Sequence, residues 1–433
     1  MKRIVILGGG TGGTLAANRL RRAYSRDAAE IVVIDQDAQH VYQPGLLFVP
    51  FGRADVAHLT RQRQRQLRDG ISFRRAGVDL VGLASDCVHL DDGQSLEYDV
   101  LVVATGARLL PEETEGLNGP GWLTDVFTFY TPDGATALHR ALERFTGGRL
   151  VVNVIDMPIK CPVAPLEFCF LADDYFRSRG IRDGVEISYV TPLDGAFTKP
   201  VCNKELSGLL AAKGIDLVTE FNTGTVESGT PESGRGRTGG RLISYDDRTV
   251  PFDLAVVIPL HGGAAYVGRS PGLGDELGFI PVDPATLQAR AKPNVFALGD
   301  ATDAPTSKAG SVAHFEGDVL AANVRRFLAG EPLSASFDGH TNCFIETGAG
   351  KALLIDFNYG TEPLTGHYPG PVGLPLLRES RLNHLGKLAF QQFYWHSLLP
   401  GYDIPGISST MPSRGKRRMP DRDTAPADHG GHR

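Results

Sequence analysis

The residue with the clearest chemical potential in this sequence is Cys161. It lies in the run Lys160-Cys161-Pro162, between a predicted strand (Leu150 to Ile155) and a predicted helix (Leu166 to Phe176). A thiol at a helix N-terminus has a lowered pKa, and a neighbouring lysine further favours the thiolate. The thiolate is the form that exchanges with disulfides. The position therefore predicts a redox-active cysteine, with a small buried hydrophobic residue as the alternative.

Four further cysteines and one carboxylate bear on the same chemistry. The cysteines are Cys87, Cys169, Cys202 and Cys343. An odd, sparse set in a long chain is not typical of a disulfide scaffold, so we expect a catalytic pair with bystanders. Cys169 lies inside the predicted helix and fits a buried hydrophobic residue, and we take Cys202 as a bystander. Glu167 is a candidate proton carrier, with a solvated acid on the helix face as the alternative.

Three glycines near the start of the chain have the spacing of a dinucleotide-binding turn. Gly8, Gly10 and Gly13 lie between a predicted strand and a predicted helix. Glycines there allow a tight turn, close approach of the backbone to a pyrophosphate, and packing of the helix on the strand. Asp35 closes the next predicted strand, 22 residues after Gly13, where a carboxylate can accept hydrogen bonds from a ribose. The alternative is a glycine-rich turn without a ligand.

The elements that must position these residues follow an α/β pattern of short apolar strands and helical runs. The first strand, first helix and second strand form a βαβ unit. The predicted strands are residues 2–7, 30–34, 98–104, 150–155, 186–190, 254–258 and 294–298, and the predicted helices are residues 14–24 and 166–176. The run from Gly224 to Gly240 is rich in Gly, Ser, Thr and Arg, and predicts an exposed hairpin loop or a mobile insertion.

The turn after the middle strand lacks what a nicotinamide cofactor needs. Residues 156–165 follow the strand at 150–155 and contain three prolines and no glycine. Proline has no N–H to donate, so this turn cannot cradle a pyrophosphate. The electrons must therefore come from, or go to, a compound other than NAD(P)H.

Two later motifs point to the kind of dinucleotide. Ala104-Thr105-Gly106 and Gly299-Asp300 each end a predicted strand. With the glycine turn they resemble the two-dinucleotide-binding-domain flavoproteins of the glutathione reductase-like superfamily. This resemblance implies two Rossmann-like domains and bound FAD, whose ribityl chain Asp300 would hydrogen-bond. Lys308 could place positive charge near the pyrimidine edge of the reduced flavin, with an exposed loop lysine as the alternative.

Three further stretches resemble the sulfide:quinone oxidoreductases and the related flavocytochrome c sulfide dehydrogenases. They are residues 160–167, residues 342–357 and residues 385–401. The resemblance implies a disulfide or persulfide bridge between Cys161 and Cys343 beside the flavin, attacked by hydrosulfide. We expect Cys161 to accept the sulfide and Cys343 to react with the flavin, and the reverse assignment stays open. No cysteine lies between residues 107 and 149, which favours a two-cysteine mechanism.

The expected electron acceptor is a membrane quinone. By resemblance Lys387 belongs to the quinone site, where Phe344 and Phe357 would sandwich the ring. The segment Leu385 to Leu399 is amphipathic, which predicts a helix in the membrane interface and a peripheral membrane protein. The alternative is a helix packed on the core or in a dimer contact. The apolar residues of this segment are Phe390, Phe393, Tyr394, Trp395, Leu398 and Leu399.

The composition of the chain argues against some classes of function. The net charge of -6 argues against nucleic-acid binding, which needs a basic face. No apolar run approaches the roughly 20 residues of a membrane span. We also expect a homo-oligomer and no metal site, although His429 and His432 in the tail could hold a metal weakly. The predicted domains are an FAD-binding domain (1–110 with 291–340), a second Rossmann-like domain (111–290), a C-terminal region (341–406) and a disordered tail (407–433).

Three rival functions remain at this point. A flavocytochrome c-type subunit would pass electrons to a cytochrome instead of a quinone. A type II NADH dehydrogenase would need a second glycine fingerprint, which the turn at residues 156–165 does not supply. A flavin- or sulfur-binding sensor would bind its ligand without turnover.

Overall fold

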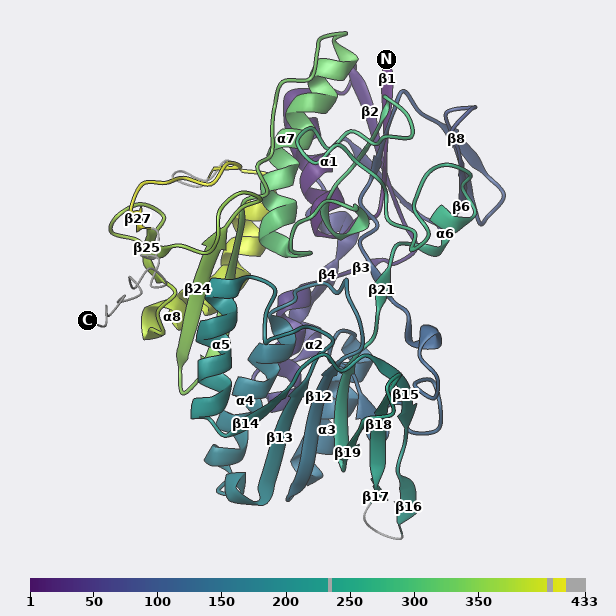
Figure 1. Ribbon diagram of the computed structural model, residues 1–433. Coiled ribbons are helices and arrows are strands. Elements are labelled where there is room, and N and C mark those ends of the chain that lie inside the picture. The colour runs from purple at the N-terminus through teal and green to yellow at the C-terminus, as the bar shows by residue number, and fades with distance from the viewer. Residues whose placement is uncertain (233–235, 403–407, 418–433) are drawn as a thin grey trace, which may run out of the picture.

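The computed structural model describes residues 1–232, 236–402 and 408–417. Two five-stranded parallel sheets organise it, one in the upper and one in the lower half of Figure 1. The first sheet has the order β22–β9–β1–β2–β5. Its strands are β1 (Lys2–Leu7), β2 (Ala29–Asp35), β5 (Ile71–Arg75), β9 (Val100–Val103) and β22 (Val295–Ala297). Helices α1 (Thr11–Ala23) and α7 (Gly310–Leu328) pack against each other beside this sheet.

The second sheet has the order β11–β20–β12–β13–β14. Its strands are β11 (Val126–Phe127), β12 (Gly148–Val154), β13 (Val185–Val190), β14 (Ile215–Val218) and β20 (Leu254–Ile258). Helices α3 (Pro132–Arg144), α4 (Ala164–Ser178) and α5 (Pro200–Ala212) accompany it. The largest apolar cluster joins this sheet to α4 and to the C-terminal region. The fold is therefore α/β, with two parallel sheets of Rossmann type.

Smaller elements connect the two sheets. Two short helices, α2 (Val56–Leu59) and α6 (Ala265–Gly268), are among these elements. The small antiparallel sheets comprise β3 (Gln39–Val41), β4 (Thr60–Gln62), β6 (Val78–Gly82), β7 (Cys87–Leu90), β8 (Ser95–Glu97), β10 (Arg108–Leu109), β15 (Thr223–Glu227), β16 (Thr230–Glu232), β17 (Gly236–Thr238), β18 (Gly240–Ser244), β19 (Thr249–Phe252) and β21 (His261–Gly262).

Every strand and helix predicted from the apolar runs has a counterpart in the structure. The strands at 2–7 and 254–258 have the predicted bounds, and the helix predicted at 166–176 extends to Ala164–Ser178. β1 and β9 are buried almost along their whole length, which is why they read as continuous apolar runs in the sequence. The segment 224–240 contains the hairpin β16–β17, as predicted. The first sheet takes strands from residues 2–103 and from 295–297, while the exact domain boundaries stay a prediction.

The C-terminal region is a hairpin covered by one helix. The hairpin consists of β23 (Thr341–Gly348) and β24 (Lys351–Phe357), and α8 (Arg381–Phe393) packs on β24 at the edge of the molecule (Figure 1). The π-helical turn Tyr394–Leu398 continues α8. Within the part of the chain that the structure describes, no helix has the length and apolar character to cross a bilayer.

The predicted apolar face of the segment 385–399 is only partly an outer face. Its second half turns inward, because Tyr394, Trp395, Leu398 and Leu399 are all buried in the main core. The exposed apolar side chains lie instead on α8, where Leu382, Leu385 and Leu388 are 54%, 59% and 50% exposed. The alternative of a helix packed on the core is therefore correct for the aromatic half of this segment, whereas α8 has an exposed apolar face.

Part of the predicted tail is ordered. Strands β25 (Thr365–Tyr368), β26 (Leu374–Leu376) and β27 (Lys416–Arg417) form a sheet, so residues 416–417 differ from the expected disorder. The side chain of Lys416 is buried, and its Nζ lies 2.7 Å from Oδ1 of Asp356, which is also buried. His429 and His432 lie outside the described residues.

Candidate active site

The glycine turn between β1 and α1 is closely packed on one side and open on the other. Gly8 has φ +91°, and a Cβ there would lie 2.4 Å from the carbonyl oxygen of Ala104. A Cβ on Gly13 would lie 1.8 Å from the carbonyl oxygen of Gly8, so only glycine fits. Around Gly10 no atom lies within 4 Å of the Cβ position. The turn therefore leaves room beside the first N–H groups of α1, which have no partner within the helix.

Asp35 ends β2 beside this turn, where the fingerprint predicts a ribose-binding carboxylate. One carboxylate oxygen accepts a hydrogen bond of 2.7 Å from the N–H of Gly9. The same oxygen lies 3.2 Å from a guanidinium nitrogen of Arg63, which is itself buried. Asp35 thus has the predicted position, and its contact with a ribose stays a prediction. Arg63 is a residue of this site that sequence analysis missed, because no motif includes it.

The strand ends at 104–106 and 299–300 lie on the same side of the first sheet as the glycine turn. Gly106 has φ +67° and open space at its Cβ position, and the Thr105 hydroxyl lies 3.5 Å from the hydroxyl of Tyr266. Burial raises the pKa of Asp300 against the opposing pull of Lys308 and Lys160. The ammonium of Lys308 donates to the carbonyl oxygens of Asp300 and Thr302, at 3.1 and 2.8 Å, so its predicted role beside a flavin remains untested.

Glu316 is a buried carboxylate on α7 that sequence analysis missed. One oxygen accepts a hydrogen bond from the N–H of Gly299, and the other has no partner within the described residues. Burial raises the pKa of this carboxyl to about 8. The available signal was a glutamate in the apolar helical run Val312 to Gly317. The open glycine turn and the positive end of α1 together fit a dinucleotide such as FAD.

Cys161 lies three residues before α4, in a backbone conformation that is rare for a side-chain-bearing residue. Its φ is +49°, and such a conformation costs roughly 1–2 kcal/mol. Three hydrogen bonds hold it: its N–H donates to the Lys308 carbonyl at 2.6 Å, and its carbonyl accepts from Ala164 N–H at 2.9 Å and from the Tyr130 hydroxyl at 3.3 Å. The loop is therefore fixed from three separate elements.

The predicted low pKa of Cys161 is wrong for the structure as it stands. Burial raises the pKa of this thiol, and the negative charges of Glu167 and of Cys343 raise it further. The cation that opposes this shift is Lys387, whereas Lys160 was the expected one. The helix-terminus rule assumes a solvated thiol, and here the loss of water outweighs the helix and its neighbouring charges.

Cys343 lies on β23 and shares its surroundings with Cys161. Burial raises its pKa to about 12, Glu167 adds to the shift, and Lys387 opposes it. Both cysteines pack against the same apolar cluster, and the charge of Cys343 contributes to the raised pKa of Cys161. The structure therefore brings together two thiols 182 residues apart in the sequence. Both are free thiols, so the bridge between them stays a prediction.

A buried ion pair acts electrostatically on both cysteines. Glu167 on α4 and Lys387 on α8 are paired through Oε1 and Nζ, with side chains 2% and 11% exposed. The same carboxylate oxygen accepts a 2.7 Å hydrogen bond from the N–H of Glu346. Burial outweighs the pull of the ammonium, so the pKa of Glu167 stays above its ordinary value. The predicted solvated acid is thereby excluded for Glu167, and its role as a proton carrier remains a prediction.

The predicted quinone sandwich does not match the hairpin. Phe344 pairs with Leu354 across the hairpin, whereas Phe357 pairs with Thr341. Side chains alternate along a strand, so Phe344 and Phe357 point to opposite faces. Phe357 belongs to the main core beside Cys343, and Phe344 packs in a small separate cluster with Leu354. These two rings cannot enclose one quinone between them, and Lys387 is bound to Glu167.

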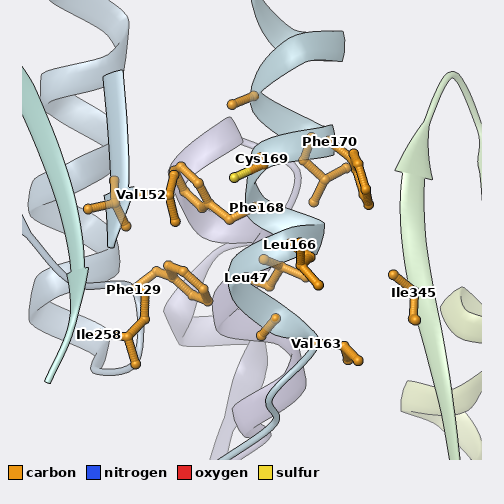
Figure 2. Packing of buried hydrophobic residues seen from close by; sticks show 14 of the residues in the cluster. Leu47, Phe129, Val152, Val163, Leu166, Phe168, Cys169, Phe170, Ile258 and Ile345 are labelled. Carbon is orange, nitrogen blue, oxygen red and sulfur yellow. The ribbon is translucent and has the colours of Figure 1, made fainter. Parts of the chain in front are cut away.

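The other cysteines are buried among apolar side chains. Cys169 and Cys202 are almost fully buried, and Cys87 lies on β7 far along the chain from α4. In Figure 2, Cys169 lies on α4 between Phe168 and Phe170, with its sulfur directed into the apolar cluster. Burial raises the pKa of the Cys169 thiol. These positions suit a packing role, as expected for bystanders.

A hydrogen-bonded chain joins the C-terminal segment to the glycine turn. His40 is buried, and burial lowers its pKa to about 3, so its ring is neutral. Its Nδ1 donates to the Gly9 carbonyl at 3.1 Å, which leaves Nε2 to accept from the Tyr394 hydroxyl at 2.6 Å. The Tyr394 oxygen in turn accepts from the Thr11 hydroxyl at 2.7 Å. The turn after α8 thus supports the first residue of α1.

We expect Tyr394→Phe to weaken this support. The change leaves the buried Nε2 of His40 without a partner, which costs about 1–3 kcal/mol of the free energy of unfolding. Urea unfolding of the purified protein measures the loss, and Tyr402→Phe is the control because Tyr402 is 46% exposed on the same segment. Equal stability of Tyr394→Phe and the wild type would show that the network contributes nothing.

Comparison with known proteins finds similarity to flavin-dependent oxidoreductases of the kind indicated by the sequence motifs. The family described as "Pyridine nucleotide-disulphide oxidoreductase" matches residues 2–153. The chain is 27% identical over 404 residues to the mitochondrial sulfide:quinone oxidoreductase of Dictyostelium discoideum, covering 92% of this chain and 86% of that protein. It is 25% identical over 402 residues to the mouse enzyme of the same name, with the same coverage.

Comparison with solved structures finds a similar fold. The structure of the sulfide:quinone oxidoreductase from Aquifex aeolicus superposes with a TM-score of 0.78 at 19% identity, covering 93% of this chain and 92% of that one. The resemblance indicated by the motifs around Cys161 and Cys343 is therefore confirmed over nearly the whole described chain.

Proposed function

We propose that this chain is an FAD-dependent sulfide:quinone oxidoreductase that works through Cys161 and Cys343. The observation that carries the proposal is that two thiols distant in the sequence are both under the electrostatic influence of one buried ion pair, Glu167–Lys387. The similarity to sulfide:quinone oxidoreductases over about nine tenths of the chain supports it. The turn after β12 contains no glycine, which disfavours a nicotinamide as the electron donor.

FAD, when bound, accepts two electrons at a time and releases them to an acceptor. In this proposal the glycine turn, the N-terminus of α1 and Asp35 hold its dinucleotide part. Asp300, Thr105 and Gly106 hold the part nearer the reacting ring. The loop of Cys161, held by the backbone of Lys308, would present one thiol to that ring.

The cysteine pair performs the sulfur chemistry. HS⁻ attacks Sγ of Cys161 in the Cys161–Cys343 bridge, a persulfide forms on Cys161, and Cys343 leaves as a thiolate with the electron pair. Lys387 opposes the rise that burial causes in the pKa of both thiols, and so favours each thiolate. Glu167 acts in the opposite sense, and it is the buried group best placed to take or return a proton.

The acceptor side of the proposal places the quinone near α8. The three exposed leucines of α8 give this helix an apolar outer face, as expected of a helix that lies in a membrane interface. We propose peripheral attachment to a membrane through this face. Phe344 and Lys387 lie beneath it, in contact through the Phe344 carbonyl at 3.4 Å. Self-association of the chain is also part of the proposal, and no residue is assigned to it.

Anaerobic titration of the purified holoprotein with sulfide tests the proposal. We expect sulfide to bleach the flavin absorbance at a stoichiometry of one two-electron donor per flavin, and a short-chain quinone to restore it. NADH should not bleach the flavin, and cytochrome c should not replace the quinone. The control is Cys87→Ala, which should behave as the wild type. Failure of sulfide to bleach the flavin would refute the proposal.

A further inference from the structure

The proposed reaction has a proton requirement that the protein must meet. Conversion of HS⁻ to zero-valent sulfur releases one proton and two electrons. Reduction of a quinone to the quinol consumes two protons and two electrons. Each turnover therefore takes one proton from water, and that proton must reach a site that is closed off from solvent.

A histidine–carboxylate pair connects the surface with the interior at this place. His384 lies on α8, three residues before Lys387, and Glu346 lies on β23, two residues after Phe344. Nδ1 of His384 is 3.0 and 2.9 Å from the two carboxylate oxygens of Glu346. The His384 side chain is 21% exposed, whereas that of Glu346 is only 1% exposed. One end of the pair thus meets solvent and the other is buried.

The inner end of the pair adjoins the groups proposed for the quinone. Glu346 and Phe344 are two residues apart on one strand, so their side chains share a face of the hairpin. The N–H of Glu346 donates to Glu167 at 2.7 Å, and the charge of Lys387 acts on both carboxylates. The charged groups that face Glu346 are therefore His384 and Lys387 from α8 and Glu167 from α4.

A second histidine, His340, immediately precedes β23 and is not suited to relay a proton. His340 is fully buried, and its Nδ1 lies 2.9 Å from the carbonyl oxygen of Ser408. Its Nε2 lies 3.4 Å from Asp356, whose other oxygen is paired with Lys416. Both ring nitrogens are thus occupied by buried protein groups. His384 has no such second partner among the described residues.

We propose that His384 and Glu346 form the route by which a solvent proton reaches the quinone while it is reduced. The inference rests on the proposed function. Protonated His384 gives the proton on Nδ1 to the Glu346 carboxylate, and the Glu346 carboxyl gives it to a quinone oxygen as that oxygen gains negative charge. His384 is then protonated again from water. His384 acts through Glu346 and is a positioning and relay residue, while Glu346 is the group that meets the quinone.

Rapid mixing separates this step from the sulfide reaction. The holoprotein is first reduced with one equivalent of sulfide without oxygen and then mixed with a short-chain quinone. We expect His384→Ala to slow flavin reoxidation about 100-fold, with the rate of reduction by sulfide within about twofold of the wild type. Added imidazole should restore at least a tenth of the wild-type rate in His384→Ala, because it can occupy the vacated surface position and supply the proton.

Two further variants sharpen the test. Glu346→Gln should slow reoxidation as strongly, and imidazole should not rescue it, because the inner group is then missing. His396→Ala is the matched control, since His396 is exposed on the turn that continues α8. Binding of an unreactive quinone analogue, measured by calorimetry, should have the same affinity in His384→Ala and the wild type. Should Glu346→Gln fail to fold, His384→Ala with imidazole decides the matter alone.

The outcomes distinguish this inference from the function on which it rests. Unchanged reoxidation in His384→Ala would overturn the relay, and so would slow reoxidation that imidazole does not restore. Loss of analogue binding in His384→Ala would assign the residue to binding and would also overturn the relay. A wild-type protein that sulfide reduces but no quinone reoxidises would overturn the proposed function, and the relay with it.

Discussion

Serine in place of either Cys161 or Cys343 should abolish sulfide-driven quinone reduction, with a loss of at least about a thousandfold. A hydroxyl forms neither a disulfide nor a persulfide, so neither variant can form the bridge that HS⁻ attacks. The charges of Glu167 and Lys387 act on both thiols. Neither cysteine can replace the other, because one lies in the loop before α4 and the other on β23. The measurements are the rate at which sulfide bleaches the flavin and the steady-state rate of quinone reduction.

The two serine variants should keep their fold. Each change exchanges sulfur for a smaller oxygen at a half-buried position, and we expect the free energy of unfolding to change by about 1 kcal/mol. Cys87→Ala provides the control for removal of a thiol elsewhere. Full sulfide-driven turnover in either serine variant would exclude a mechanism through this pair, whereas intact folding with lost turnover supports it.

The backbone of this protein could be predicted from its sequence because buried parallel strands have a simple pattern. The apolar runs at 2–7 and 254–258 predict buried parallel strands, and the structure has them with those bounds. The glycine turn followed for a steric reason, since a Cβ on Gly8 or Gly13 would overlap backbone atoms. In both cases residues close together in the sequence determine the local structure.

The site was predictable only in part, because its properties depend on residues far apart in the chain. Glu167 and Lys387 are 220 residues apart, and nothing near either one indicates that they pair. The pKa of Cys161 was predicted in the wrong direction for the same reason: the sequence shows the helix and Lys160, but it does not show the burial that raises the pKa of this thiol.

The error over Phe344 and Phe357 has a different origin, the register of a hairpin. Which residues share a face depends on where the turn lies, and here a bulge falls between Glu346 and Gly348. A shift of one residue moves every side chain to the other face. Sequence similarity can therefore place both aromatic residues in the right hairpin without showing that they point in opposite directions.

The ion pair at the centre of the site leads to the second large effect. We expect Lys387→Met to destabilise the protein by about 3–5 kcal/mol at pH 7, because it leaves the Glu167 carboxylate buried without its cation. It should also slow the sulfide reaction about tenfold or more, since Lys387 stabilises both thiolates. Lys387→Arg keeps the charge and should lose less, and Lys351→Met is a control because Lys351 is exposed on β24.

The destabilisation should depend on pH in a defined direction. The pKa of Glu167 is already raised in the folded protein, so the folded state binds this proton more tightly than the unfolded state, and stability falls as pH rises through the interval between the two pKa values. Removing the ammonium raises the folded pKa further and widens that interval upward. The stability lost on Lys387→Met should therefore be larger at pH 7 than near pH 5, where the carboxyl is protonated in the variant. Urea unfolding at both pH values measures the difference. An equal loss at the two pH values would mean that Lys387 supports the fold through its packing rather than by neutralising Glu167. Lys387 could then no longer be taken as the cation that stabilises the two thiolates.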